Sequence, residues 1–232
     1  MWSWRVLIWG RSSGIHTIRL VNAILSSLKT RWNILSHSFW CHTHSCSICV
    51  SGVCLTATQL SNDAFKVGLA PETLKRTYFS TLQPNTLVNL ERASEIGGRN
   101  SGHFVQGHVD GVGTIVDKYE EGDSLHIVVQ TTPDIMKYIV EKGFIAIDGT
   151  SLTVVSVHPA AQTFQFMLVE YTQKKIVVPL KTVGEKVNIE VDVLGKYSES
   201  ALAAILPRLE ALEAKVASLE KELAGKSPNP IV

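Results

Sequence analysis

The chain has 232 residues, of which 45% are hydrophobic and 19% charged, and its formal net charge is +1 at pH 7. This length allows one large or two small domains, and the apolar fraction is enough to bury a core. The near-neutral charge gives no reason to expect a nucleic-acid partner. No apolar run approaches the roughly 18 residues of a membrane-spanning helix. We therefore expect a globular protein with neither nucleic acid nor membrane as a partner.

Residues 1–46 differ in composition from the rest of the chain. All five Trp lie in the first 40 residues, and the first acidic residue is Asp63. Basic residues, many Ser and no acids fit a mitochondrial transit peptide, whereas a secretory signal fits less well. A third interpretation is a mistaken exon or read-through that is not native protein sequence. The internal repeat described next favours this third interpretation.

The cysteines form a cluster with histidines, at Cys41, His42, His44, Cys46 and Cys49. A structural zinc site usually takes two separated pairs of ligands around a folded loop, and no second pair follows downstream. Nothing else in the sequence indicates an oxidising compartment, so disulfides are not favoured either. We expect no metal.

Residues 54–92 and 151–191 contain an internal repeat, and its motifs occur in the same order. The matched positions are Thr73 with Thr172, Asn89 with Asn188 and Glu91 with Glu190, each pair 99 positions apart, and Cys54 with Ser151, 97 apart. The repeat predicts two similar domains in tandem.

Each domain is predicted to be rich in strands that form a small closed barrel. The first domain has a short helix start at 71–74. In the second domain, 133–142 has helical spacing between a Pro and a Gly. The expected strands of the second domain are 107–116, 124–131, 143–148, 152–157, 164–169 and 187–191.

The first domain lacks a matching first half. Only 47–52 (SICVSG) resembles the second domain, at 144–149 (FIAIDG), and residues 1–46 show no likeness to 103–142. A transit peptide would be added ahead of the missing strands and would not replace them. We therefore expect an incomplete first barrel with unpaired strand edges, preceded by a foreign segment.

The C-terminal tail has the apolar spacing of a coiled coil. The positions are Leu202, Ile205, Leu209, Leu212, Val216, Leu219 and Leu223. Self-association is favoured over a single amphipathic helix that packs on its own domain, and Pro207 is expected to kink the helix or start it.

Several motifs occur together in a specific order. They are 47–56 (SICVSGVCLT), 71–74 (PETL), 88–92 (VNLER), 102–110 (GHFVQGHVD), 148–153 (DGTSLT) and 194–197 (LGKY). The ordered set resembles the riboflavin synthase family, from about Ser47 to Tyr197, and the version at 171–173 (YTQ) resembles its fungal members.

The resemblance implies a mainly all-β fold of tandem duplicated six-stranded barrels with short helices, plus a C-terminal amphipathic helix that forms a homotrimer. The corresponding division is 1–46 foreign segment, 47–102 incomplete barrel, 103–198 second barrel and 199–225 trimerisation helix. It implies dismutation of two 6,7-dimethyl-8-ribityllumazine molecules to riboflavin and 5-amino-6-ribitylamino-uracil, without metal or external cofactor. It also implies catalysis where the first barrel of one subunit meets the second barrel of a neighbour. The alternatives are a non-catalytic lumazine or flavin carrier and a coiled-coil interaction protein. We expect a cytoplasmic location, or a mitochondrial one if residues 1–46 are a transit peptide.

Carried over by position, the resemblance implies catalytic roles for Ser47, Cys54, His108 and Thr153. A thiol at Cys54 could act near C7 of a lumazine, although unpaired Cys is also common as a small buried apolar residue. His108 is suited to acid–base work because imidazole titrates near neutrality.

Two groups of residues are implied to bind substrate. The first lumazine would contact Leu55, Thr56, Gly68, Leu69, Ala70, Pro71, Glu72, Thr73 and Asn89. The second would contact Gly107, Val109, Lys142, Ser151, Leu152, Met167, Leu168, Val169, Glu170, Tyr171 and Thr172, with Asp192 near the subunit contact. For the Thr and Asn residues, hydrogen bonding within turns is the alternative.

Two departures from the family pattern count against full activity. The family begins Met-Phe-Thr-Gly, which residues 1–46 do not reproduce, and 100–103 (NSGH) stands where Gly-Gly-His is usual.

Overall fold

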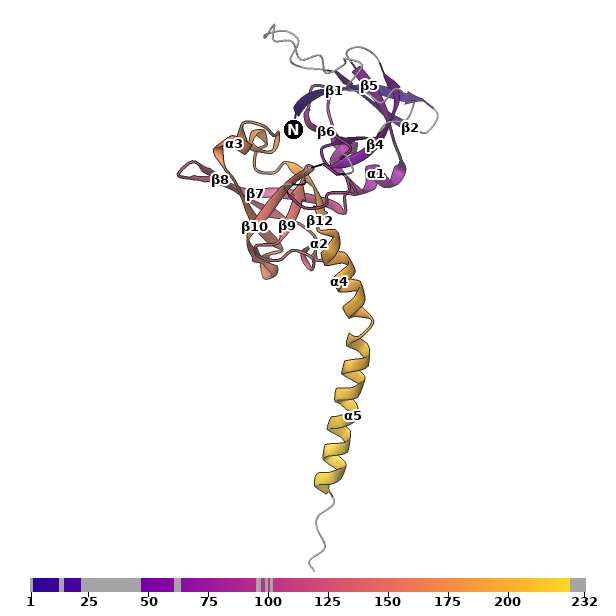
Figure 1. Ribbon diagram of the computed structural model, residues 1–232, viewed down its shortest axis with the longest axis vertical. Helices are drawn as coiled ribbons and strands as arrows, with labels where there is room; N and C mark the ends of the chain where they lie inside the picture. The colour runs from indigo at the N-terminus through magenta and orange to yellow at the C-terminus, as the bar shows by residue number, and fades with distance from the viewer. Residues whose placement is uncertain are drawn as a thin grey trace, which may run out of the picture. The chain divides into compact units, whose positions relative to one another are not determined.

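The structure is a computed structural model, and it describes residues 2–12, 15–21, 47–60, 64–94, 97, 98, 100 and 102–225. Figure 1 shows one barrel drawn in indigo to magenta, a second in pink to orange, and two helices that follow the second barrel along the chain. No described helix is both long enough and apolar enough to span a membrane.

The second barrel is closed by six antiparallel strands, as the sequence predicts. Residues such as Ile127, Phe164 and Phe166 are fully buried inside it, each worth about 1.5–3 kcal/mol of transfer free energy. The strands, in the order β10-β11-β8-β7-β12-β9, are β7 (Gly111–Glu121), β8 (Ser124–Gln130), β9 (Phe144–Ile147), β10 (Thr150–His158), β11 (Thr163–Leu168) and β12 (Lys186–Val191).

The first barrel is also closed, and its strand order is the same. Strands β1 to β6 take the places of β7 to β12, in the order β1-β2-β5-β4-β3-β6. The strands are β1 (Trp2–Ser12), β2 (Ile15–Val21), β3 (Ser47–Val50), β4 (Val53–Leu60), β5 (Ala64–Leu69) and β6 (Leu87–Arg92). Identical topology in the two halves is the structural counterpart of the sequence repeat.

Strands β1 and β2 correct the expectation of an incomplete first barrel. β1 pairs with β6 from Trp2↔Leu90 to Arg5↔Leu87, and β2 pairs with β5 from His16↔Leu69 to Val21↔Ala64. Self-comparison missed them because a strand needs only a compatible backbone and an open edge to pair with, not a sequence that resembles its counterpart.

The helices between the strands are short. They are α1 (Pro71–Arg76), η1 (Tyr78–Thr81), α2 (Pro133–Met136), η2 (Pro159–Ala161), α3 (Glu170–Gln173) and η3 (Val178–Leu180). The predicted helix over 133–142 is therefore too long. After α2 the backbone turns more tightly, with bonds from Tyr138 N–H to Ile135 O and from Ile139 N–H to Met136 O, and Lys142 adopts a left-handed φ of 61°.

The two barrels meet through a pair of buried asparagines, one from each repeat. The Asn89 amide donates to Asp148 O (3.0 Å) and accepts from Val177 N–H (2.9 Å). The Asn188 amide donates to Ser51 O (2.9 Å) and accepts from the N–H of Tyr78 (3.2 Å). This arrangement, which we call the asparagine seam, has a twofold pattern of bonds.

Two hairpin turns face each other at the asparagine seam. Gly52 and Gly149 both have a φ of +82°, which follows a left-handed Ser51 in one turn and a left-handed Asp148 in the other. A Cβ on Gly52 would lie 2.6 Å from Gly149 N, and one on Gly149 would lie 2.8 Å from Gly52 N. Glycine is therefore required at both positions by backbone conformation and by space.

The seam is asymmetric in its charges. Asp148 is fully buried and lies 2.6 Å from the Lys181 ammonium, which sits 4.1 Å from the centre of the Tyr78 ring. Loss of hydration raises the pKa of Asp148, and the Lys181 charge opposes that shift. The first repeat has Ser51 and Leu82 at the corresponding positions and no such ion pair.

The C-terminal tail forms two helices, α4 (Val193–Ala203) and α5 (Leu206–Gly225). The break before Pro207 confirms that this proline starts a new helix, which suits its missing N–H. The apolar residues of the predicted coiled-coil seam are about half exposed or more, from 49% at Leu209 to 69% at Leu223.

Candidate functional site

The β3–β4 hairpin presents one apolar face and one reactive face. Ile48, Val50, Val53 and Leu55 are buried in the barrel. The alternate residues Ser47, Cys49, Cys54 and Thr56 point outward, because side chains alternate along a strand. Ser47 is opposite Thr56, and Cys49 is opposite Cys54. Cys54 is exposed and is therefore not the small core residue that was its alternative interpretation.

The β9–β10 hairpin repeats this arrangement in the second barrel. Phe144 lies opposite Thr153 and Ala146 opposite Ser151, in the same register. Thr153 is exposed and Ser151 is half-buried. Leu55 and its counterpart Leu152, both predicted to bind substrate, instead point into the two cores, so only their backbone groups are available to a ligand.

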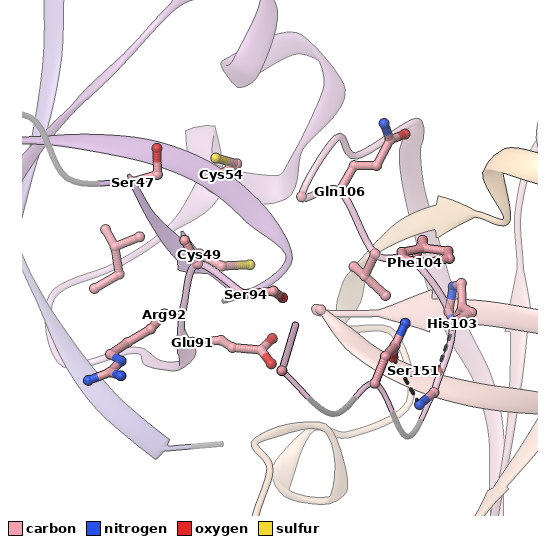
Figure 2. Close-up of a pocket in the computed structure, with 18 of the residues that line it drawn as sticks. Ser47, Cys49, Cys54, Glu91, Arg92, Ser94, His103, Phe104, Gln106 and Ser151 are labelled. Atoms are coloured by element: carbon pink, nitrogen blue, oxygen red, sulfur yellow. Dashed lines mark hydrogen bonds between the residues drawn. The ribbon is translucent and has the colours of Figure 1, made fainter. Parts of the chain in front are cut away.

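A cavity of about 840 Å³ lies where the outward faces of the two hairpins approach each other. Figure 2 shows the β3–β4 hairpin and Glu91 on one wall, and His103, Phe104 and Ser151 on the other. Its lining includes the predicted residues Ser47, Cys54, Gly107 and Ser151. This volume falls within the range of about 300–1,000 Å³ that is usual for small-molecule sites.

Residues 102–110, which we call the connecting segment, contribute residues 102–107 to a wall of the cavity, and hydrogen bonds hold the segment in place. The carboxylate of Glu190 accepts the N–H groups of Gln106 (2.7 Å) and His108 (2.9 Å). Gly107 O accepts the N–H of Cys54 at 2.8 Å, and a Cβ on Gly107 would lie 2.7 Å from that of Cys54. The left-handed Gly107 thus lets the segment pass directly beside the Cys54 backbone.

His103 joins the connecting segment to Ser151. Its Nδ1 lies 2.7 Å from Ser151 Oγ, and its ring stacks on Phe144 with centroids 5.0 Å apart. Burial lowers the pKa of His103, although the nearby Asp192 carboxylate opposes the shift. A neutral His103 with the proton on Nδ1 donates to Ser151 Oγ and leaves the hydroxyl proton of Ser151 free to bind a ligand.

The structure does not bring every predicted site residue into this cavity. His108 and Thr153 are exposed and do not line it, and Val109 packs against the core of the first barrel. Asn89, predicted to bind the first lumazine, has both ends of its amide engaged in the asparagine seam. We therefore correct its assignment from ligand binding to the contact between barrels.

Most of the other predicted binding residues lie along β5–α1 and its counterpart β11–α3, whereas Lys142 precedes β9 and Asp192 follows β12. In the first barrel, Gly68 to Thr73 run from β5 into α1, with Leu69 buried and Glu72 paired with Arg76. In the second barrel, Met167, Val169 and Tyr171 are exposed apolar residues, at 40%, 49% and 74% of their surface. Exposed apolar side chains beside short helix starts suit a flat heterocyclic ligand. Leu168 is buried, Glu170 and Lys142 are exposed, and Thr172 and Asp192 are partly exposed.

Cys49, Glu91 and His103 are among the cavity residues that were not predicted as site residues. Cys49 could have been found from the hairpin register, since it is two residues from Ser47 on the same face. Burial raises the pKa of its thiol to about 12, and Glu91 adds to the shift. Burial also raises the pKa of Glu91. His103 was visible in the motif at 102–110, but its contact with Ser151 depends on tertiary structure.

Within the described residues, no group of three or more His, Cys, Asp or Glu side chains is placed to hold a metal. Of the cluster considered for zinc, Cys41, His42, His44 and Cys46 lie outside those residues, and Cys49 belongs to β3.

Two barrels of one topology, with matched hairpins that face a shared cavity, define a duplicated ligand-binding protein. The family described as lumazine binding domain matches residues 14–93 and 106–192, once for each barrel. The first match begins ahead of β2, which corrects the expectation that all of residues 1–46 is foreign to the family.

Curated relatives identify a family within the class of lumazine-binding proteins. The riboflavin synthase of Saccharomyces cerevisiae (strain ATCC 204508 / S288c) is 48% identical over 169 residues, covering 72% of this chain and 71% of the relative. The riboflavin synthase of Schizosaccharomyces pombe (strain 972 / ATCC 24843) is 46% identical over 165 residues, covering 71% and 78%. The chain belongs to the riboflavin synthase family.

Solved structures agree on the fold. LumP complexed with riboflavin has a TM-score of 0.68 at 18% identity, and LumP complexed with 6,7-dimethyl-8-(1'-D-ribityl) lumazine has a TM-score of 0.66 at 17% identity. Each comparison covers 82% of this chain and 95% of the neighbour.

Proposed function

We propose that this protein is a riboflavin synthase that converts two molecules of 6,7-dimethyl-8-ribityllumazine into riboflavin and 5-amino-6-ribitylamino-uracil. One lumazine donates a four-carbon unit to the other, so the reaction requires two flat rings held face to face. The observation that carries the proposal is the pair of matched hairpin faces, one per barrel, in a chain 48% identical to a riboflavin synthase. Two matched hairpin faces suit a reaction between two copies of one substrate.

The main contribution of the site to the rate is the positioning of the two lumazines. Holding two reactants in register accounts for much of the rate in such a reaction. We assign binding of the pyrimidinedione and ribityl groups to hydroxyl and backbone groups on the outward faces and on the β5–α1 and β11–α3 segments. The hydroxyls on those faces belong to Ser47, Thr56, Ser151 and Thr153. Tyr171 and Met167 offer apolar surface to the ring of the second lumazine.

The chemical steps fall to groups of the first barrel and the connecting segment. A proton leaves the acidic C7 methyl of one lumazine, and C7 of the other is activated by an acid, a base or a nucleophile. We assign Cys54 and Ser47 to this second role because both line the cavity. His108 follows Gly107 by one residue, and its exposed ring is free to serve as the acid or base.

We further propose that the protein is a homotrimer whose α4 and α5 apolar residues pack together. Their exposure in the single chain and their coiled-coil spacing support this proposal. In such an assembly His108 and Thr153, which do not line the cavity of one chain, belong to a site shared with a neighbouring subunit. Replacing Leu212 and Val216 with Asp should reduce the solution mass from trimer to monomer, as measured by sedimentation or light scattering. A trimer that survives both changes excludes the tail as the contact.

We propose that the protein acts in the cytoplasm, a compartment in which thiols such as those of Cys49 and Cys54 are kept reduced. Strands β1 and β2 pair with β6 and β5. This pairing supports the proposal that residues 2–12 and 15–21 belong to the first barrel and are not a transit peptide.

Incubation with 6,7-dimethyl-8-ribityllumazine tests the proposal. Riboflavin fluorescence should rise while one uracil product forms for each riboflavin, with no metal or cofactor added. A non-catalytic lumazine or flavin carrier is the alternative, and LumP, which has the same fold, is found complexed with a lumazine and with riboflavin. Saturable binding without either product would favour the carrier and exclude the enzyme.

A further inference from the structure

The two cysteines of the β3–β4 hairpin lie directly opposite each other. Cys49 on β3 is paired with Cys54 on β4, and both are free thiols. Residues opposite each other on antiparallel strands project from the same face of the sheet. The two thiols therefore share the cavity side of the hairpin, and both line the cavity.

The position of the pair within the hairpin suits a covalent bond. A two-residue turn at Ser51 and Gly52 makes Val50 and Val53 the hydrogen-bonded pair, so Cys49 and Cys54 form the next, non-hydrogen-bonded pair. The Cys54 N–H confirms this, because it donates to Gly107 O and not to β3. Non-hydrogen-bonded pairs have Cα atoms about 4.5 Å apart, inside the span of roughly 4.4–6.8 Å that a disulfide accepts.

The two thiols differ in access. Cys54 is exposed, whereas Cys49 lies deeper and its sulfur is close to the Gly149 turn. In Figure 2 the two sulfurs do not point at each other, so a bond requires rotation of the side chains while the hairpin backbone stays in place. The deeper thiol is also the harder one to ionise, because burial raises the pKa of Cys49.

We propose that Cys49 and Cys54 are a reversible modification site, at which a glutathione-type disulfide converts the two thiols into a cross-strand disulfide. The Cys54 thiolate attacks one sulfur of the oxidant, whose S–S bond breaks and releases one glutathione thiolate. Cys49 then gives its proton to solvent and attacks Cys54 Sγ, releasing the second glutathione. Two protein thiols are oxidised and one glutathione disulfide is reduced to two glutathiones.

The consequence of the bond is the loss of the Cys54 thiol from the cavity. The second barrel cannot undergo this change because it has Ala146 and Ser151 at the matching positions. The modification is therefore specific to one of the two hairpin faces. It does not depend on the proposed reaction, since the bond is detected in the protein itself.

The experiment uses the full chain with Cys41→Ser and Cys46→Ser, which leaves Cys49 and Cys54 as its two cysteines. After treatment with glutathione disulfide, intact mass spectrometry should show the loss of two hydrogens, with neither thiol open to iodoacetamide. Dithiothreitol should restore both thiols. The matched control adds Cys49→Ala, which copies Ala146 of the second repeat and should instead retain one glutathione on Cys54.

Two outcomes would overturn the inference. One is an oxidised chain that keeps a glutathione adduct whether or not Cys49 is present. The other is a chain whose two thiols both stay reactive while a small dithiol in the same solution is oxidised. Melting curves of the Cys49→Ala chain check that the control is folded, and Cys49→Ser serves as a second control if it is not.

Discussion

The two barrels share one topology but differ at the residues that face the cavity and at the asparagine seam. The first hairpin carries Cys49 and Cys54 where the second carries Ala146 and Ser151. The first turn carries Ser51 where the second carries the buried Asp148, which is paired with Lys181. Duplication has kept the strand order and the two asparagines while the side chains on each copy diverged. A scaffold of backbone pairing tolerates such divergence because it depends little on the outward side chains.

The asparagine seam contains two kinds of polar group, the asparagines and a buried ion pair. The asparagines bond to backbone atoms of the opposite barrel in both directions, and they recur in both repeats. The ion pair between Asp148 and Lys181 occurs in the second repeat alone. Each of its charges depends on the other, because a buried charge without a partner is costly. We therefore expect the repeats to respond unequally to matched substitutions.

The largest effect should come from breaking the buried ion pair. Lys181→Leu, which copies Leu82 of the first repeat, leaves the buried Asp148 carboxylate with the Asn188 N–H as a donor but without its charge partner, and should lower the free energy of unfolding by about 3–5 kcal/mol. Adding Asp148→Ser, which copies Ser51, should recover most of the loss. Urea denaturation of the single and double variants measures both values. If the single and double variants are equally stable, the loss in the single variant does not come from the unpaired charge of Asp148.

Turnover should depend on the thiol of the first hairpin face. Cys54→Ser gives both hairpins a Ser at this position and should lower kcat by at least about tenfold, as should His108→Ala if it acts as acid or base. Lumazine binding, followed by fluorescence titration, should change far less. Ser151→Cys is the reciprocal control on the second face. A Cys54→Ser protein with unchanged kcat would remove the thiol from the mechanism.

Ligand affinity should depend on the hydrogen bond between His103 and Ser151. Ser151→Ala should weaken lumazine binding by about 1 kcal/mol, or roughly fivefold in Kd. His103→Asn can place an amide N–H near the position of Nδ1, whereas His103→Gln places it nearer Nε2. Binding should therefore be retained better by the Asn variant. If the Asn and Gln variants lose the same lumazine affinity, His103 acts by packing against Phe144 and not by positioning the Ser151 hydroxyl.

The stability of the protein should fall in acid partly through His103. Its pKa is lowered by burial, so the unfolded chain takes up a proton first as the pH decreases below about 6.5. The contribution of neutral His103 is fully present above that pH and is lost as the pH falls through the folded pKa. Thermal melting from pH 7.5 to pH 5 should show a smaller loss for His103→Asn than for the natural chain. A steeper loss in the variant would contradict the sign.

The smallest effect should come from an exposed ion pair of the second barrel. Glu170 and Lys174 are one helical turn apart in α3 and largely exposed, so Lys174→Ala should change the free energy of unfolding by less than about 0.5 kcal/mol. The same urea experiment compares this variant with Lys181→Leu. A loss as large as that of Lys181→Leu would show that exposure does not distinguish the two lysines.

Much of the architecture could be predicted because it follows from sequence patterns that are visible along the chain. Short β-branched runs between turn residues located the strands β8 to β12, and the 99-residue spacing of Asn89 and Asn188 indicated the duplication. Residues 2–12 and 15–21 were not found, because their sequence does not resemble that of β7 and β8. Their place in the barrel is set by the open edges of β5 and β6.

The candidate site divides in the same way. The motif around 47–56 indicated Ser47 and Cys54, and strand alternation places both on the outward face. Asn89 was assigned to a ligand because the resemblance to the family implies that role for its position. The contacts that explain it come from Asp148 and Val177, which lie 59 and 88 residues away. Likewise, His103 meets Ser151 across 48 residues.

The sequence by itself determined the duplicated barrels, the family motifs, the reactive hairpin and the helical tail, because each is encoded in residues that are neighbours along the chain. Only the tertiary structure decided that β1 and β2 close the first barrel, that the asparagines join the two halves and that His103 meets Ser151 at the cavity. These features depend on contacts between distant segments, and a hydrogen bond or a packed turn exists only when both partners have been brought together.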